Sequence, residues 1–225
     1  IFQMIEGEKL GSFWGYTFAG VWQEDDVNAP FVDANGQTNG KTNGEVYKVK
    51  PGNSKYVDVN KDGVYNDADQ GIIGCGQPTF NWGWNNTFNY KNFDFSFFVV
   101  GFHGFDIYNA THQMGYNLIK SQQMAGVTPM RELLNRWTPT NTNTDIPGFV
   151  KGGTENKDFF STRFVENGSF IKMKSITLGY TLPEATCRSL GINNLRVYAS
   201  VQNPFHITKY SGLDPEATMG SPLVQ

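Results

Sequence analysis

The chain has 225 residues, a length that fits one domain or most of one. Aromatic residues make up 15% of it and charged residues only 17%, and it contains 25 glycines, so strands and turns are favoured over helices. The net charge of -3 offers no basic surface for nucleic acid. No apolar run reaches the ~18 residues that a membrane helix needs, so any membrane-spanning part would have to consist of strands.

The first predicted strand covers residues 11–22, where Trp14, Tyr16 and Phe18 alternate with smaller side chains. The chain before it begins at Ile1, with neither an initiator methionine nor a positively charged apolar signal segment. We therefore expect the sequence to be a mature product or a fragment.

Residues Asp58–Asp69 have the spacing of a calcium-binding loop. Side chains that carry oxygen occupy loop positions 1, 3, 5, 9 and 12, and glycine occupies position 6, where the chain must turn sharply. The Pro51-Gly52 pair before the loop excludes a preceding helix, so we expect an isolated loop rather than a helix–loop–helix sensor. The alternative is a solvated turn rich in Asp, Asn and Gly. The predicted Ca²⁺ ligands are Asp58, Asn60, Asp62, the Val64 carbonyl, Asn66 and Asp69.

The second predicted strand, residues 79–90, has the clearest period of two in the chain. One set of alternate positions is almost entirely aromatic, namely Phe80, Trp82, Trp84, Phe88 and Tyr90. The other set is polar or small and includes Asn81, Gly83, Asn85, Thr87 and Asn89. The pattern predicts a strand with one face toward an apolar medium and one toward water.

Three more strands follow. Lys91-Asn92 predicts a tight turn into a strand at 93–105, whose far end is apolar on both faces. Residues Met114–Trp137 contain four leucine or isoleucine side chains and are expected to form short helices within a loop. The last two predicted strands cover 170–182 and 195–202, both with alternating apolar positions.

The connections between these strands favour a membrane β-barrel. Two are long, at about 23–78 and 106–168, and long loops without structure count against a compact soluble domain. Long outer loops that alternate with short periplasmic turns are typical of barrels. A strand of about eleven residues spans ~36 Å, or ~28 Å when tilted by ~40°, close to the ~25 Å apolar band of a barrel. A secreted β-sandwich is the alternative, but its inner face would favour Val, Ile and Leu.

Several segments together resemble the C-terminal barrel region of SusC/RagA-type TonB-dependent transporters of the Bacteroidetes outer membrane. The similarity covers nearly the whole chain in the order of that family. Its segments are Leu10–Tyr16, Gly20–Gln23, Tyr56–Gly63, Gly74–Pro78 followed by Phe80, Asn85–Phe88, Tyr90–Asp94, Arg136–Pro139, Thr144–Pro147, Ile176–Pro183, Asn194–Tyr198, and Lys209–Gly212 with Asp214–Glu216.

The resemblance implies an all-β fold of antiparallel strands from a large barrel of the 22-stranded class, of which this chain is a fragment. It implies import of oligosaccharides or peptides with energy from TonB, and a SusD-like surface lipoprotein as partner. The plug domain and the final strand are expected to be absent from residues 1–225. The implied location is the bacterial outer membrane, with lipid around the strands.

Other candidate sites carry weaker signals, and we expect no enzyme. Asp94, Asp106, Asp145 and Glu166 could form a carboxylate pair for glycoside hydrolysis, but no spacing places two of them together. The three histidines, His103, His112 and His206, lack the spacing of a metal site. Trp82 and Trp84 could stack on sugars, although their position on the apolar face favours lipid.

Two functions from different classes remain open. One is a segment of an outer-membrane nutrient importer, and the other is a soluble, calcium-stabilised β module that binds glycans at a cell surface. The barrel topology places Cys75 on the outer side and Cys187 on the periplasmic side of a hydrocarbon layer ~25–30 Å thick. A disulfide needs Cα atoms within ~7 Å, so we expect no bond between these two cysteines.

Overall fold

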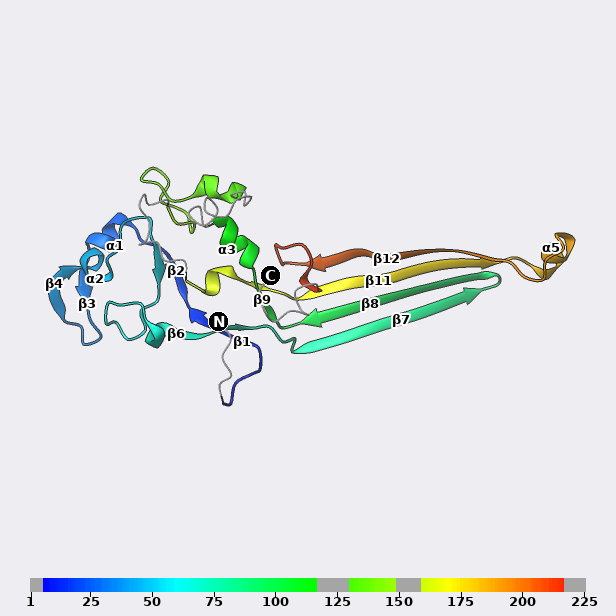
Figure 1. Cartoon of the computed structure of the whole chain (residues 1–225), viewed down its shortest axis with the longest axis horizontal. Helices are drawn as coiled ribbons and strands as arrows, with labels where there is room; N and C mark the ends of the chain where they lie inside the picture. The colour runs from blue at the N-terminus through cyan, green and yellow to red at the C-terminus, as the bar shows by residue number, and fades with distance from the viewer. Residues whose placement is uncertain (1–5, 117–129, 149–158, 217–225) are drawn as a thin grey trace.

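The computed structural model describes residues 6–116, 130–148 and 159–216, and it has two parts (Figure 1). A long four-stranded antiparallel sheet extends toward one end, and short strands and helices gather at the other. The region of short strands and helices is named the outer part. Within these described ranges, no helix is long and apolar enough to cross a membrane.

The long sheet has the strand order β12-β11-β8-β7. The turn between β7 and β8 has Lys91 at a φ of 52°, the left-handed conformation that a tight hairpin requires. The short helix α5, Glu184–Ser189, lies in the connection from β11 to β12. The strands, each within a few residues of its predicted start, are β7 (Phe80–Tyr90), β8 (Phe93–His103), β11 (Phe170–Thr181) and β12 (Arg196–Thr208).

The last strand is longer than the predicted 195–202, because β12 continues to Thr208. A β-bulge accounts for the difference. The register shifts between Met173 and Ser175 on β11, opposite Asn203, whose φ of 48° is left-handed. The apolar alternation of β12 is interrupted at Asn203. Beyond the bulge, Phe205 and Ile207 lie on the same face as Val201, and pairing with β11 continues to Thr208.

The predicted strand at 11–22 is two strands in the structure, and neither belongs to the long sheet. The segment β1 (Ser12–Tyr16) pairs with β6 (Gln70–Cys75), whereas β2 (Phe18–Val21) pairs with β5 (Ser54–Tyr56). The change of partner falls at Thr17, whose carbonyl accepts from the Val57 N–H at 2.9 Å. Both halves alternate correctly, so the local pattern does not reveal the change of partner.

The two predicted outer loops contain secondary structure of their own. Residues 23–78 form α1 (Glu24–Asn28), the β3–β4 hairpin (Pro30–Val32 and Thr38–Thr42), α2 (Asn43–Tyr47), β5, the 3-10 helix η1 (Asp67–Asp69) and β6. Residues 106–168 include β9 (Asp106–Tyr108), α3 (Ala110–Tyr116), η2 (Arg131–Asn135), η3 (Thr162–Phe164) and β10 (Val165–Asn167). The expected helices at Met114–Trp137 correspond to the end of α3 and to η2, and residues 117–129 lie outside the described part.

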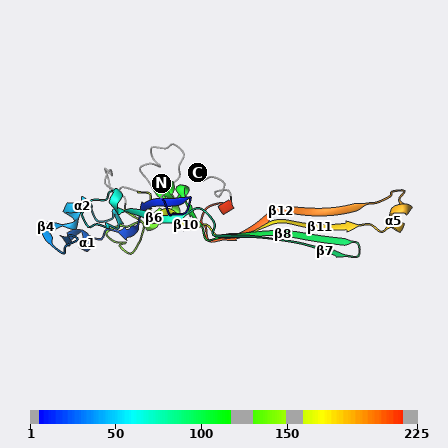
Figure 2. The same ribbon diagram turned by 90° about the horizontal axis from the view of Figure 1, so that it is seen from below.

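The short strands β9 and β10 lie beyond the ends of β8 and β11. After β8 the chain continues into β9, which pairs with β10, and β10 leads directly into β11. The short sheets therefore follow on from the ends of the long strands, as the views in Figures 1 and 2 agree.

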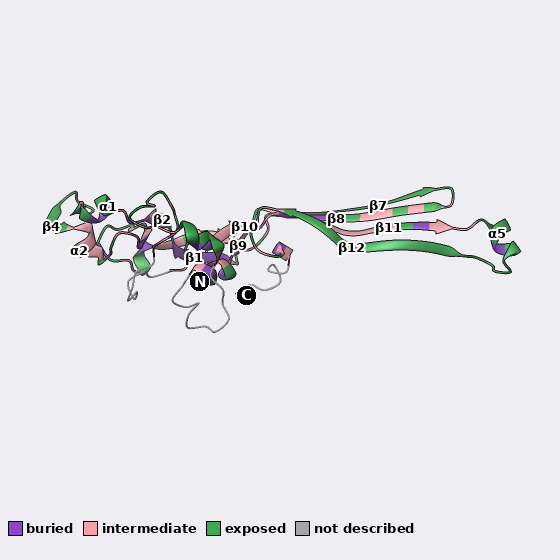
Figure 3. Ribbon diagram, turned by 90° about the horizontal axis from the view of Figure 1, so that it is seen from above, coloured by how far each residue is buried: buried purple, intermediate pink, exposed green. Residues whose placement is uncertain are grey.

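Burial differs sharply between the two parts (Figure 3). Among the described residues, most fully buried side chains, such as Phe164 and Phe170, lie in the outer part or where it joins the long sheet, and Cys187 in α5 is the exception. Most of β12 is exposed, and the long sheet is a single layer along most of its length (Figures 2 and 3). Such a layer does not bury enough apolar area to be stable alone in water, so it requires other surroundings.

Candidate calcium loop and two-faced sheet

The Asp58–Asp69 loop lies between β5 and β6, two strands of the outer part. It is therefore flanked by strands on both sides, with η1 at its end. Gly63 has a φ of +83°, and a Cβ at this position would overlap the Val46 side chain. Only glycine satisfies both conditions, as position 6 of a calcium loop requires.

Asp58 is positioned at the start of the loop by two donors. Its Oδ2 accepts from the Gly63 N–H at 2.9 Å and from the Tyr47 hydroxyl at 2.8 Å. Its Oδ1 is buried and has no hydrogen-bond partner. An unpartnered buried carboxylate oxygen is costly, and a bound cation would compensate it. Burial and the hydrogen bond to Asp58 raise the pKa of Tyr47, so Tyr47 remains a donor at neutral pH.

Asp62 gathers the neighbouring side chains in the middle of the loop. Its Oδ2 accepts from the Asn60 and Asn66 amides at 3.0 and 3.1 Å, and its Oδ1 accepts from the Val64 N–H at 2.8 Å. The Asn66 amide also donates to the Val64 carbonyl at 3.3 Å. Hydrogen bonds from Val64 and Asn60 lower the pKa of Asp62 and keep it ionised.

Asp69 closes the loop from the other side and is buried. Its Oδ1 accepts from the Val59 N–H at 2.8 Å, and its Oδ2 accepts from the Asn66 N–H at 3.0 Å. Within the described ranges, no three His, Cys, Asp or Glu side chains are arranged to hold a metal. The structure thus brings together Asn60, Asp62, Val64 and Asn66, while the carboxylates of positions 1 and 12 each bind backbone.

The chemistry of this donor set fits Ca²⁺ better than any transition metal. All the predicted ligands are carboxylate, amide or carbonyl oxygens, which hard cations prefer. The Asn60 and Asn66 amides direct their NH₂ groups at Asp62, and a 180° rotation of each would present oxygen instead. In this structure the two amide oxygens accept from backbone instead, Asn60 from the Asp62 N–H at 3.1 Å and Asn66 from the Ala68 N–H at 2.8 Å, so binding would require these hydrogen bonds to be exchanged for the ion.

Tyrosines connect this loop to the rest of the outer part. The Tyr47 ring stacks on Tyr65 with centroids 5.2 Å apart, and the Tyr65 hydroxyl accepts from the Tyr56 N–H at 3.4 Å. Burial raises the pKa of Tyr65 to about 12, so it too stays neutral. The Tyr56 hydroxyl accepts from the Phe159 N–H at 3.1 Å, in the segment that leads to η3. The sequence pattern did not identify these tyrosines.

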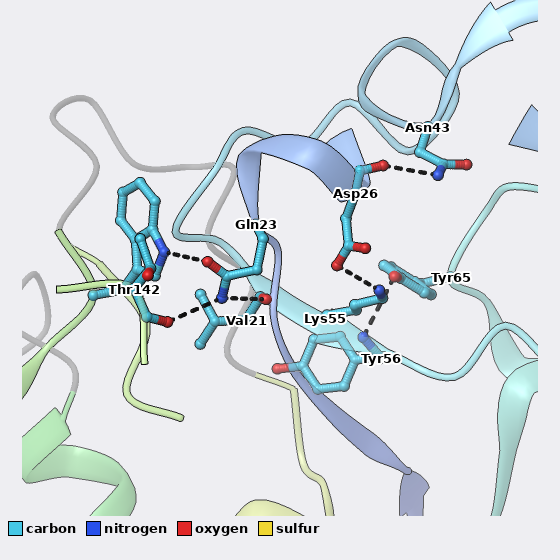
Figure 4. A network of polar contacts seen from close by, with 9 residues as sticks. Val21, Gln23, Asp26, Asn43, Lys55, Tyr56, Tyr65 and Thr142 are labelled. Atoms are coloured by element: carbon cyan, nitrogen blue, oxygen red, sulfur yellow. Dashed lines mark hydrogen bonds and ion pairs between the residues drawn. The ribbon is translucent and has the colours of Figure 1, made fainter. Parts of the chain in front are cut away.

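A polar network joins the two outer loops (Figure 4). Gln23 donates to the Val21 and Thr142 carbonyls at 3.2 and 3.3 Å, and its Oε1 accepts from Trp137 Nε1 at 2.9 Å. Nearby, Lys55 binds Asp26 at 2.8 Å. The residues that follow β2 are thereby fixed to a segment more than a hundred positions later in the chain.

The long sheet has two chemically different faces that continue across all four strands. Apolar residues pair with apolar residues across neighbouring strands: Trp84 on β7 pairs with Val99 on β8, and Phe97 on β8 pairs with Ile176 on β11. Rings on this face also contact one another, for example Phe88 and Phe97 with centroids 6.2 Å apart. The aligned apolar side chains are Trp82, Trp84, Phe88 and Tyr90 on β7, Phe93, Phe95, Phe97 and Val99 on β8, Ile176, Leu178 and Tyr180 on β11, and Val197, Ala199 and Val201 on β12.

The opposite face carries polar and small residues, with one ion pair across three strands. Arg196 on β12 donates to both carboxylate oxygens of Asp94 on β8, at 3.0 and 2.6 Å. The pair lies over Gly179 on β11, where a Cβ would overlap both side chains. Thr177 and Ser200 share a hydrogen bond at 2.9 Å on the same face.

The other predicted candidates do not form a catalytic carboxylate pair: Asp106 and Glu166 lie one register position apart on the paired strands β9 and β10, but each binds a different donor. Asp94 binds Arg196, Asp106 accepts from the Cys75 N–H at 3.0 Å, and Glu166 accepts from Ser211. His103 Nε2 accepts from Trp82 Nε1 at 3.2 Å and so belongs to the aromatic face. The remaining histidines are on different elements: His112 on α3 faces Glu166, and His206 on β12 pairs with Lys172.

The two cysteines are both free, as predicted. Cys75 ends β6 in the outer part and is half-buried, whereas Cys187 is buried in α5. Figure 1 shows α5 and β6 at opposite ends of the long strands. The sheet therefore separates the two thiols by its whole length.

Comparisons with known proteins give the same family throughout. The chain is 35% identical over 212 residues to TonB-dependent receptor P3 of Formosa agariphila, covering 94% of this chain and 19% of the relative. It is 32% identical over 173 residues to TonB-dependent receptor SusC of Bacteroides thetaiotaomicron, covering 76% of this chain and 16% of the relative. No family model matches the chain.

Solved structures show the same fold. The structure of the RagAB peptide transporter superposes with a TM-score of 0.63 at 24% identity, covering 92% of this chain and 20% of that one. The RagAB peptide importer in its open-open state gives a TM-score of 0.66 at 22% identity, covering 96% of this chain and 21% of that one. The chain thus spans about a fifth of the length of these relatives. It is a fragment of the β-barrel region of a SusC/RagA-type TonB-dependent receptor.

Proposed function

We propose that this chain forms part of the wall of an outer-membrane TonB-dependent importer. The observation that carries the proposal is the register-matched apolar face of the long sheet. Phe80, Trp84 and Tyr90 on β7 are 60%, 55% and 70% exposed, and Val197 and Ile207 on β12 are 59% and 64% exposed. A single layer with this much aligned apolar surface suits contact with lipid, and its polar face suits an aqueous lumen.

The importer as a whole would act with partners that lie outside residues 1–225. TonB would deliver energy through the N-terminal region of the receptor, and a SusD-like surface lipoprotein would cover the outer mouth. The names of the relatives support this assignment. The proposed substrates are oligosaccharides or peptides, and the outer part described above is the portion that would face them and the lipoprotein.

An arginine scan along β7 in the full-length receptor tests the two faces. Trp84→Arg should destabilise the folded receptor in bilayers by ~2–4 kcal/mol, because it places a charge at the midplane of the lipid. Asn85→Arg, its neighbour on the polar face, is the matched control and should have little effect. The measurement is the free energy of unfolding in lipid vesicles. Equal tolerance at both positions would contradict the proposed orientation.

The soluble glycan-binding module makes a different prediction for extraction. A receptor whose strands contact lipid should leave the membrane fraction only with detergent. Release of the full-length protein by high salt or alkaline washing, without detergent, would favour the soluble module instead.

We further propose that the Asp58–Asp69 loop binds one Ca²⁺ with a structural role. The partnerless Oδ1 of Asp58 and the all-oxygen donor set support it. Asp58, Asp62 and Asn66 would contribute side-chain oxygens and Val64 its carbonyl. Asn60 and Asp69 would complete the shell. The ion would supply the positive charge that the Asn60 and Asn66 amides direct at Asp62 in this structure.

Replacing both Asp58 and Asp62 by Ala should abolish stoichiometric calcium in the purified receptor, because two charged ligands are lost. Metal content by mass spectrometry provides the measurement. Terbium luminescence sensitised by Tyr47, whose hydroxyl contacts Asp58, provides a second one. Asp33→Ala, in an exposed turn outside the loop, is the control. Calcium retained at one ion per chain in the double variant would rule out this loop as its site.

A further inference from the structure

The segment after β12, residues 209–216, turns back over the outer end of the long sheet (Figure 1, red). It lies on the polar face, because its partner Lys172 shares that face with Thr177 and Gly179 in the register with β8. Tyr210 packs against the cluster formed by Val100, Phe105, Ile107 and Phe170. This cover explains why the far end of the third predicted strand is apolar on both faces.

A polar clamp holds the first half of the segment. Glu166 of β10 accepts from the Ser211 N–H at 2.8 Å and from the Ser211 hydroxyl at 2.7 Å. Asn109, which is buried, donates to both Glu166 and Ser211, at 2.8 and 3.0 Å. Each polar group of the clamp therefore has a partner that depends on the segment being in place.

An ionic clamp holds the second half. The Lys172 side chain is only 7% exposed, and its ammonium donates to Asp214 and to Glu216, both at 2.7 Å. Lys174, the bulged residue of β11, also binds Glu216. Burying a charged lysine without a counter-ion costs a large amount of free energy. Lys172 is therefore stable in this buried position only while the segment supplies its two carboxylates.

We propose that residues 209–216 form a detachable strap, latched across the inner face of the barrel wall at its outer end by these two clamps. The assignment of this face to the lumen rests on the proposed function. Tyr210 and the buried Pro215 add apolar contacts, whereas Leu213, between the clamps, is 98% exposed and points away from the wall. Its release would uncover a strip of the inner wall at the mouth without unpairing β11 from β8 or β12.

Hydrogen exchange on the full-length receptor in detergent micelles tests the strap. The double variant Asp214→Asn with Glu216→Gln should raise exchange of the strap amides by about tenfold or more, because it removes both ionic partners of Lys172. Exchange within β11 and β12 should stay unchanged. Glu184→Gln removes an equally negative but exposed carboxylate, and Leu213→Ala alters the strap between its clamps, so both controls should leave exchange as it is.

Two results would overturn the proposal. One is unchanged exchange of the strap in the double variant, and the other is an equal rise across β11 and β12, which would make the segment an integral part of the sheet. If the double variant does not fold, Ser211→Ala removes the hydroxyl from the polar clamp and should produce a smaller rise confined to the strap. Failure of the barrel proposal would appear separately, as extraction without detergent.

Discussion

At the scale of single residues, the geometry of the Asp58–Asp69 loop depends on two residues, Tyr47 and Gly63, that are not themselves predicted ligands. Tyr47, the last residue of α2, both donates to Asp58 and stacks on Tyr65, and thereby links the candidate calcium loop to α2. Gly63 permits the turn that places its own N–H on Asp58. Neither residue would be a ligand, yet both determine the geometry of the loop.

Gly63→Ala should destabilise the loop by ~1–2 kcal/mol or more, because alanine is strained at a positive φ and its Cβ meets Val46. Gly36→Ala is the matched control, since Gly36 has a φ of +77° but open space around the added Cβ. The difference between the two variants isolates the overlap with Val46. Local opening free energies from hydrogen exchange of the loop amides measure it, and equal values for the two variants would contradict the argument.

At the scale of elements, the bulge on β11 and the strap belong together. Lys174 is the bulged residue and has no cross-strand partner in the register of β11, and its side chain binds Glu216 of the strap. An irregularity in the sheet thus provides one of the anchors of a segment about forty residues later in the chain. Burial cost at Lys172 is offset by two carboxylates, so the strap and the strand stabilise each other.

The strap should loosen in acid. Burial opposes ionisation of Asp214 and Glu216, but hydrogen bonds from Lys172, with Lys174 at Glu216, outweigh it and lower both pKa values. A carboxyl whose pKa is lowered by folding contributes stability that is complete above its unfolded pKa of ~4 and is lost as the pH falls through the folded pKa. Hydrogen bonds from Ser211 likewise lower the pKa of Glu166, against the effect of burial.

The measurement is strap exchange between pH 7 and pH 3, divided by the intrinsic rate at each pH. Normalised exchange should be flat above about pH 5 and rise below about pH 4. The imidazoles near these carboxylates are His206, beside Asp214, and His112, 3.5 Å from Glu166. A rise that is already complete above pH 5 would contradict the assignment to the carboxylates.

At the scale of the whole molecule, the long strands separate two ends with different surroundings. The outer part buries an aromatic core and joins its two loops through Gln23 and Trp137. The other end consists of a tight turn and the short helix α5. This asymmetry matches long outer loops and short periplasmic turns.

Cysteine labelling in intact cells tests this polarity. Cys75 in the outer part should react with a membrane-impermeant thiol reagent, whereas Cys187, which is 1% exposed in α5, should not. Both should react after the receptor is denatured, which controls for reagent and yield. Labelling should be repeated in cells that lack the lipoprotein, so that a shielded Cys75 becomes accessible. Preferential labelling of Cys187 in those cells would reverse the proposed topology.

The sequence by itself determined the local features of this protein. Alternation at 79–90 predicted both the strand and its two faces, and Lys91-Asn92 predicted the hairpin, because side-chain period and turn chemistry depend on adjacent residues. The spacing at Asp58–Asp69 likewise predicted a loop with glycine at its sharp turn. Only the tertiary structure decided which strands pair and which side chains hold the strap. The split of 11–22 between β6 and β5, and the clamps of the strap, arise from contacts between residues far apart in the chain, which a local pattern does not encode.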